Sequence, residues 1–516
     1  MDSLCKKSAT ELADLIRKKE VSSKEVVEAH FKRISEVNPY LNAITLTLEE
    51  SALEAAERAD NASEADRKKP FHGVPFTIKE NIDFKGTPTT QGVPLLAESM
   101  PPRNAPIVDR MMEAGAIPIG RTNLPEMGMR LDTDNPLRGR TFNPWNKGLT
   151  PGGSSGGEAA AIATGMSPFG LGNDIGGSLR NPAYCCGIAS LKPTIGRIPF
   201  VSSIEPFVDM GISGAFLTDG PMARSVKDLK AGLAVMAGRH IDDPQSVDAP
   251  LDGPVPEKPK AALVKEISNF KLPDATIKEI EKAGSILSNN GWQVEEVEAP
   301  EVERVYEIWG TVLNNGLLEV LPDEMFKPET AEYLNRFSEP FINNGINLDE
   351  ALIERRRLRR LWSSFLTDYS VCIGPTWSNL PWPIDTDLDP VKGDSVLKES
   401  FIFTLICYSA NEEYWGNMAK STTEDLKKIG RVLTTPLGKI SLSKEQVVAV
   451  DLQVESITLA KLIYKKDWVI EKIKSTALEF EIANNRKPTI ALMGLAFKPD
   501  IDDLRESPAL QVADTL

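Results

Sequence analysis

Two glycine-rich stretches hold the serines that are best placed to do chemistry. The first reads TPGGSSGGEAAA from Thr150 to Ala161, and the second reads GNDIGGSLRNPA from Gly172 to Ala183. Glycine permits positive φ and close approach of a substrate, so successive N–H groups can converge on one negatively charged atom. Neither stretch contains the GxxxxGK[ST] or GxGxxG pattern of nucleotide-binding loops. Nucleotide binding is therefore weakly supported, and the serines become candidate nucleophiles.

A serine nucleophile needs a base, and Lys79 is the candidate that the sequence offers. The three histidines, His30, His72 and His240, lie in unrelated contexts. Lys79 ends the apolar run 74–78 in GVPFTIKENID, where burial would disfavour the ammonium form and lower the pKa. The alternative is a lysine that extends from a strand end to solvent. From this segment alone, both interpretations stay open.

Taken together, these segments resemble the amidase signature family over about residues 5 to 410. Lys79 precedes Ser154 by 75 residues, and Ser154 precedes Ser178 by 24, which are the separations typical of that family. Further matching segments are RTNLPE at Arg121 to Glu126, NPW at Asn143 to Trp145, CGIASLKPT at Cys186 to Thr194 and GPMARSVKDL at Gly220 to Leu229.

The resemblance implies a Ser-Ser-Lys triad, with Ser178 as nucleophile, Ser154 as bridging serine and Lys79 as base. It also implies a cis peptide between Gly153 and Ser154. The expected reaction is hydrolysis of a carboxylic amide to a carboxylate and ammonia or an amine, through a serine acyl-enzyme and without metal or cofactor. The implied oxyanion hole consists of the backbone N–H groups of Ile175, Gly176, Gly177 and Ser178. The implied substrate contacts are Met127, Gly128, Met129 and Arg130; for Arg130, a partner of a substrate carboxylate and a surface residue stay equally open.

Several neighbours of these residues are predicted to be structural. Asp174 and Arg180 have a spacing that suits an ion pair holding the glycine turn. Asn173 stands where the family usually has threonine. The vicinal Cys185 and Cys186 are interpreted as small buried residues rather than as thiol nucleophiles.

The elements that must position these residues can be read from periodicity. Capping-box spacings at Ser8 and Ser22 predict two N-terminal amphipathic helices, the second ending at Asn38-Pro39. The apolar runs 74–78 and 116–119 predict buried strands, AALVKEI predicts another strand, and Asp274 to Asn289 predicts a helix. Arginines crowd residues 355–360, where apolar residues at helical spacing predict an amphipathic helix with solvated or paired arginines rather than a nucleic-acid site. The implied fold class is α/β, a mixed, largely parallel sheet covered by helices.

The resemblance ends near residue 410, and three segments are predicted. Residues 1–410 form the amidase-signature domain, which lacks the family's final strands, and 411–457 form an unassigned connector. Residues 458–516 resemble the start of the UDP-sugar-binding domain of a UDP-N-acetylmannosaminuronic acid dehydrogenase, with the motif GLAFKPDIDDLRESPAL. That fragment lacks the dehydrogenase's nicotinamide-binding and catalytic-cysteine parts, so dehydrogenase activity is not expected.

Composition excludes several functional classes. The net charge of −15 disfavours binding to nucleic acid or anionic lipid. The 5 cysteines form no CxxC pair, so structural zinc and a disulfide framework are not expected. With no signal-peptide core and no apolar run long enough to span a membrane, a cytoplasmic protein acting on a small amide is expected. The alternatives are a non-catalytic protein with a truncated core and an amidotransferase subunit acting on aminoacylated tRNA.

Overall fold

The computed structural model describes residues 1–204, 216–251, 258–267, 272–316, 321, 323–394 and 398, together with two short strands further along the chain. Those strands, β10 (Leu433–Thr435) and β11 (Gly438–Ile440), pair antiparallel. They fall in the predicted connector, whose other residues lie outside the described part. The predicted tail 458–516 lies wholly outside the described part. The prediction that the family's final strands are missing also falls outside it, because only β10 and β11 are described after residue 398.

A mixed six-stranded sheet forms the centre of the molecule, in the order β1-β3-β2-β4-β6-β5. Its three middle strands β3, β2 and β4 run parallel, and the flanking strands run antiparallel to their neighbours. The carboxyl ends of β2 and β4 therefore meet at one edge of the sheet. The strands are β1 (Ile44–Thr47), β2 (Pro75–Lys79), β3 (Ile117–Thr122), β4 (Phe169–Asp174), β5 (Ala189–Ser190) and β6 (Thr218–Ala223).

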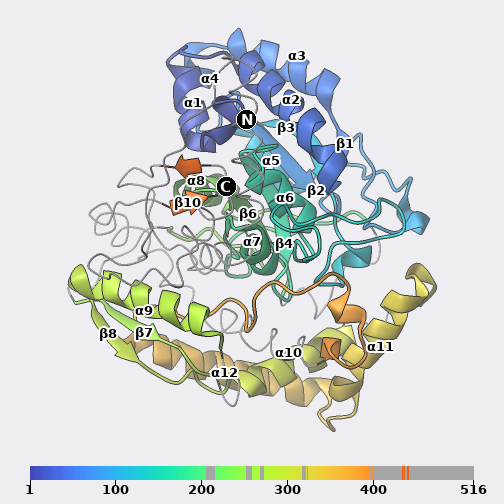
Figure 1. Ribbon diagram of the computed structural model, residues 1–516, viewed down its shortest axis with the longest axis vertical. Coiled ribbons are helices and arrows are strands. Elements are labelled where there is room, and N and C mark those ends of the chain that lie inside the picture. The colour runs from blue at the N-terminus through green and yellow to red at the C-terminus, as the bar shows by residue number, and fades with distance from the viewer. Residues whose placement is uncertain are drawn as a thin grey trace, which may run out of the picture.

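Helices cover this sheet, and the N-terminal ones gather at one end of the molecule (Figure 1). Both predicted capping boxes are present, at Ser8 with Glu11 and at Ser22 with Glu25. The second helix runs through Pro39 to Leu41 and ends at Asn42 in a left-handed conformation, so its predicted end was a few residues early. The helices are α1 (Ala9–Arg17), α2 (Ser23–Leu41), α3 (Glu49–Asp60), α4 (Glu64–Arg67), α5 (Pro106–Glu113), α6 (Gly156–Ala163), α7 (Arg180–Cys186) and α8 (Val226–Met236).

Helix α6 is buried along its whole length. At its start, neighbouring atoms lie so close to the backbone that a side chain in place of glycine would clash with them. A Cβ on Gly157 would lie 2.4 Å from the backbone nitrogen of Asn123, and one on Gly153 would lie 2.4 Å from the carbonyl oxygen of Arg130. These glycines are needed for close packing, which fixes the segment that carries Ser154.

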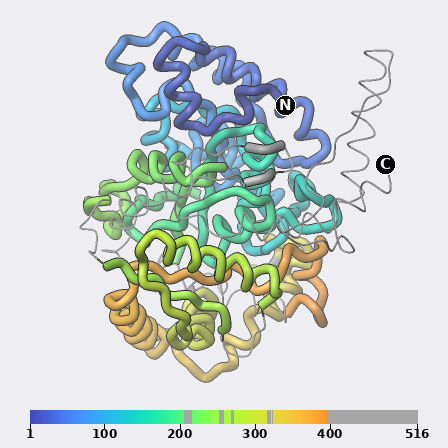
Figure 2. The backbone as a smooth tube through the Cα atoms, turned by 60° about the vertical axis from the view of Figure 1, so that its left-hand side comes forward, coloured from blue at the N-terminus to red at the C-terminus, as the bar shows by residue number. Residues whose placement is uncertain are grey.

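A second, three-stranded parallel sheet lies at the end of the molecule opposite the N-terminal helices (Figures 1 and 2). Its order is β8-β7-β9, and α9 has the predicted bounds. In α12, Arg357 forms ion pairs with Glu301 and Glu354. At the apolar positions of the pattern, Leu358 and Trp362 are buried. The predicted amphipathic helix is therefore confirmed. The elements are β7 (Lys260–Leu263), β8 (Gln293–Glu296), β9 (Val371–Ile373), α9 (Asp274–Asn289), α10 (Val302–Gly316), α11 (Pro328–Ile342) and α12 (Leu348–Asp368).

Single-turn 3₁₀ helices complete the described secondary structure, at Leu4–Lys6, Pro94–Leu96, Glu126–Gly128, Asp323–Met325 and Thr386–Leu388. Within the described part of the chain, no helix combines the length and apolar character needed to cross a bilayer.

Candidate active site

Lys79 lies at the end of β2 with its side chain entirely removed from solvent, at 0% exposure. Its Nζ is 2.7 Å from Ser154 Oγ and donates to Asn173 Oδ1, also at 2.7 Å. Burial lowers the pKa of Lys79 to about 7, against the opposing effect of Asp174, Asp219 and Glu158. The side chain is thus internal rather than extended to solvent, and a large neutral fraction is present near neutral pH.

Ser178 follows β4 on a short loop that leads into α7. Asp174 holds this loop from inside: its carboxylate accepts from Arg180 Nη2 at 2.8 Å and Nε at 3.0 Å, and from the Leu179 N–H at 3.0 Å. Although burial alone would raise the pKa of Asp174, Arg180 holds it well below the usual range. The predicted ion pair is confirmed, and the loop is fixed by a charged clamp.

The Gly177 N–H donates to Asp174 Oδ1 at 2.8 Å. Of the four backbone donors that the resemblance implies for an oxyanion hole, this one is therefore committed to the clamp. The carbonyl oxygen of Ile175 accepts from Trp309 Nε1 at 3.0 Å, which ties the loop to α10. The amides of Ile175, Gly176 and Ser178 stay predicted oxyanion donors.

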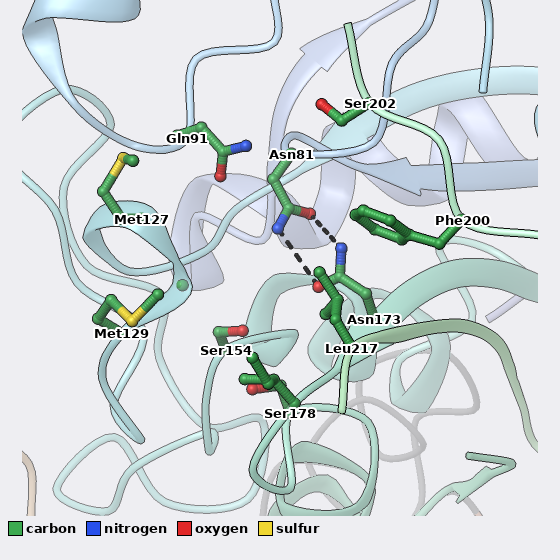
Figure 3. A pocket seen from close by; sticks show the side chains of 12 residues that line it. Asn81, Gln91, Met127, Met129, Ser154, Asn173, Ser178, Phe200, Ser202 and Leu217 are labelled. Atoms are coloured by element: carbon green, nitrogen blue, oxygen red, sulfur yellow. Dashed lines mark hydrogen bonds between the residues drawn. The ribbon is translucent and has the colours of Figure 1, made fainter. Parts of the chain in front are cut away.

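Ser154 and Ser178 line the same pocket and lie beside each other in Figure 3. The Ser155 N–H donates to the carbonyl oxygen of Ser178 at 3.2 Å, so the two serine loops are joined by a backbone hydrogen bond. The Gly153–Ser154 peptide is cis, as expected. The structure thus brings together Lys79, Ser154 and Ser178, which are distant in sequence.

Asn173 links the lysine to residues that the sequence did not single out. Its side-chain amide and that of Asn81 hydrogen-bond each other in both directions, at 3.0 and 3.3 Å (Figure 3). Asn173 also faces Asp219 across the antiparallel pair β4–β6. Burial raises the pKa of Asp219 to about 8, with a hydrogen bond to Asn173 and the charge of Lys79 partly offsetting that rise. Asn173 therefore orients Lys79 through its carbonyl oxygen.

A second buried carboxyl group that acts on Lys79 is that of Glu158 on α6. It accepts hydrogen bonds from the hydroxyls of Thr77 and Thr122, the latter at 2.7 Å. Burial raises its pKa to about 7, while the two threonines and Lys79 act in the opposite direction. Two of the three carboxyl groups that act on Lys79, those of Asp219 and Glu158, thus have pKa values raised by burial.

The pocket is a hollow of about 440 Å³ of empty space, part of which is open to solvent. Three of the four predicted substrate contacts line it: Met127, Gly128 and Met129. Among the described residues, the lining is Asn81, Gln91, Met127, Gly128, Met129, Ser154, Asn173, Ile175, Ser178, Phe200, Ser202 and Leu217.

Arg130 does not belong to this lining. It is 1% exposed, and its guanidinium donates to Asp387 at 2.8 and 2.9 Å and to Asp385 at 3.0 Å. The predicted role as partner of a substrate carboxylate is wrong for this pocket, because the charge of Arg130 is already matched by aspartates of a distant segment.

The same aspartates, with Asp132, are the one group of acidic side chains in the described chain close enough together to hold a metal ion. Arg140 donates to Asp132 at 2.6 Å and to Asp385 at 2.7 Å, while Arg130 occupies Asp387. Arginines thus supply the positive charge there, and the group is an ion-pair network joining two chain segments.

Cys185 and Cys186 are buried free thiols, as predicted. Cys186 Sγ contacts the carbonyl oxygen of Pro151, and burial raises the pKa of Cys185 well above the usual value. Neither cysteine lines the pocket.

Six pocket residues were not predicted as site residues from the sequence: Asn81, Gln91, Asn173, Phe200, Ser202 and Leu217. Apart from Asn173, which the resemblance marked only as a departure from threonine, only Asn81 could have been suspected from the sequence, since it follows the predicted base Lys79 by two residues in the segment KEN. The other four lie on loops whose course depends on tertiary packing.

The chain matches the family model described as Amidase over residues 25–427. It is 39% identical over 396 residues to an indoleacetamide hydrolase of Bradyrhizobium diazoefficiens, a match covering 75% of this chain and 76% of the relative. It is 31% identical over 417 residues to an acylamidase of Rhodococcus erythropolis, covering 78% and 86%. Among solved structures, a 6-aminohexanoate cyclic dimer hydrolase superposes with a TM-score of 0.66 at 26% identity, covering 78% of this chain and 89% of that one.

Proposed function

Because the chain belongs to the amidase signature family and is an amide hydrolase, we propose that Lys79, Ser154 and Ser178 carry its reaction and that its substrate is an arylacetamide. The single observation that carries the proposal is the fully buried Lys79 Nζ at 2.7 Å from Ser154 Oγ, in a pocket that Ser178 also lines.

In the proposed mechanism, neutral Lys79 takes the proton of Ser154 while Ser154 takes the proton of Ser178. Ser178 Oγ attacks the amide carbonyl carbon, and the carbonyl oxygen becomes negatively charged. The proton held on Lys79 then returns through Ser154 to the leaving nitrogen, so that the base acts as the acid when the C–N bond breaks. Water repeats the sequence on the acyl-enzyme and releases the carboxylate.

The negative charge on the carbonyl oxygen needs donors that are in place before the reaction. The proposal assigns this role to the N–H groups at Ile175, Gly176 and Ser178, since Asp174 takes the Gly177 N–H. Loss of one such donor typically costs about 100-fold or more in rate. The Asp174–Arg180 clamp supports this role because it fixes the turn that carries these amides.

The walls of the pocket support an aromatic acyl group. Met127, Met129, Ile175, Phe200 and Leu217 supply apolar surface next to the two serines. Methionine adapts to flat rings and makes favourable contacts with them. The similarity to an indoleacetamide hydrolase points to the same class of substrate. We therefore propose indole-3-acetamide and related arylacetamides as substrates.

The decisive experiment is Ser178→Ala in the purified chain, assayed on indole-3-acetamide, phenylacetamide and hexanamide. We expect kcat/KM to fall by about 10³-fold or more with the thermal unfolding curve unchanged, because the relay has no other nucleophile. Ser155→Ala is the matched control: Ser155 is the adjacent buried serine, it lies outside the pocket lining, and its variant should stay active.

Two results would contradict the proposal. Near-wild-type rates in Ser178→Ala would remove Ser178 as nucleophile, and a fluorophosphonate label found on Ser154 would exchange the two serine roles. Hydrolysis by the chain alone also separates an amidase from an amidotransferase subunit that needs a partner.

A further inference from the structure

Gln91 places an unpartnered amide in the wall of the pocket. The residue is 2% exposed, and its Oε1 is buried without a hydrogen-bond partner among the described residues. Buried polar groups in folded proteins are almost always paired, and an unpaired acceptor is costly. Because Gln91 also lines the pocket, a ligand bound there is a natural source of the missing donor.

The backbone holds Gln91 in a conformation that few residues with side chains adopt. Its φ is +53°, in the left-handed region, and its carbonyl oxygen accepts from the Met127 N–H at 2.7 Å. Met127, also a pocket residue, has a φ of +51°. Such conformations cluster at ligand sites, where the surroundings enforce them. Two of them joined by one hydrogen bond fix this wall of the pocket.

The position of Gln91 relative to the serines sets which part of a substrate it can meet. Figure 3 shows Gln91 well separated from Ser178, with the side chains of Met127 and Asn81 to either side of its amide. A substrate whose amide carbonyl lies at Ser178 would reach Gln91 only with the far end of its acyl group. The lining includes apolar side chains and the paired amides of Asn81 and Asn173.

We propose that Gln91 is a specificity residue whose Oε1 accepts a hydrogen bond from a ring N–H of the acyl group, so that the enzyme prefers arylacetamides with such a donor. The inference rests on the proposed arylacetamide function. A pocket with a desolvated hydrogen-bonding group discriminates strongly against an analogue that leaves this group unpaired.

The test compares indole-3-acetamide with 1-benzothiophene-3-acetamide, which has a similar shape but no ring N–H. In the wild type we expect kcat/KM to be about tenfold or more higher for the indole. Gln91→Met, which removes the acceptor with little change of size, should bring this ratio close to one. Gln91→Glu, which keeps an acceptor, should retain the preference. Met129→Leu, a change of an apolar wall residue, should leave the ratio as in the wild type.

The ratio separates this inference from the function on which it rests. If neither aryl substrate is hydrolysed while hexanamide is, the arylacetamide function fails and the inference fails with it. If both aryl substrates are hydrolysed at equal kcat/KM by the wild type, the function stands and the role of Gln91 is overturned. The wild-type ratio is sufficient for this decision even if a variant does not fold. A ratio that persists in Gln91→Met would also overturn it.

Discussion

The charge state of Lys79 is decided by burial rather than by its ionic neighbours. Desolvation lowers its pKa to about 7 although Asp174, Asp219 and Glu158 all favour the ammonium form. The pKa values of Asp219 and Glu158 are themselves raised, to about 8 and about 7. Burial thus disfavours the charged form of the lysine and of both carboxyl groups.

This arrangement predicts the pH dependence of the reaction. The base acts only when it is neutral, so kcat/KM should rise as pH increases through about 7 and fall in acid. Lys79→Ala should lose about 10²- to 10⁴-fold in kcat/KM and lose the inflection. A pH series from acid to alkaline conditions with indole-3-acetamide measures both effects.

His72→Gln is the control for the pH series, because a histidine is the usual source of an inflection near neutrality. His72 is buried against the carbonyl oxygen of Ala59, away from the pocket lining. Its variant should keep the wild-type profile. Should the inflection vanish in His72→Gln and persist in Lys79→Ala, the assignment of the base would be wrong.

Among the individual residues of the site, the sequence predicted those that belong to continuous motifs. Lys79, Ser154 and Ser178 were predicted from the spacing and neighbours that the resemblance fixes, and the structure brings the three together. Arg130 was misplaced, because its partner Asp387 lies 257 residues further along the chain. An arginine next to pocket residues and an arginine in a buried ion pair look alike in sequence, and only the fold distinguishes them.

At the scale of elements, close packing of the glycine-rich loops holds the site together. Because a Cβ on Gly157 would lie 2.4 Å from the Asn123 nitrogen, we expect Gly157→Ala to lower the free energy of unfolding by about 1–3 kcal/mol. Gly374→Ala is the control, since its Cβ would meet Val264 at an ordinary 3.5 Å. Urea unfolding of both variants measures the difference. Equal stability of the two would show that α6 can move away from its neighbour without cost.

The Arg130 network should affect stability rather than substrate choice. Arg130→Gln leaves Asp387 buried without its cation, and removal of one partner of a buried pair typically costs about 3–5 kcal/mol. Arg103→Gln, which breaks an exposed pair with Asp242, should cost less than about 1 kcal/mol. Thermal unfolding, together with kcat/KM for acidic and neutral amides, tests this. A selective loss of the acidic amides would return Arg130 to the substrate site.

Element prediction succeeded where local signals and tertiary structure agree. The capping boxes and the apolar periodicity of α9 act within a few residues, and both were predicted correctly. The end of α2 was misjudged because Pro39 lies in its last turns and the helix continues to the left-handed Asn42. The walls of the pocket near Phe200 and Leu217 could not be predicted, since those loops have no periodicity of their own.

For the whole molecule, the described residues that line the pocket lie between positions 81 and 217, and Lys79 is next to them in sequence. The predicted dehydrogenase-like tail is remote from them in the chain. We therefore expect deletion of residues 456–516 to leave kcat/KM, the melting temperature and solubility unchanged. Comparison of the full chain with the shortened one measures all three. Their joint collapse would mean that the tail completes the hydrolase fold rather than forming an independent unit.

The hydrogen bond from Trp309 to the Ile175 carbonyl gives the second sheet region a direct contact with the nucleophile loop. The emission of an indole depends on the polarity and hydrogen bonding around its N–H. Formation of an acyl-enzyme on Ser178 would attach an acyl group to the same loop. We therefore expect the emission of Trp309 to change when Ser178 is acylated, and a stopped-flow trace that is present in the wild type and absent in Trp309→Phe would time acylation separately from product release. Identical traces for the two proteins would contradict this.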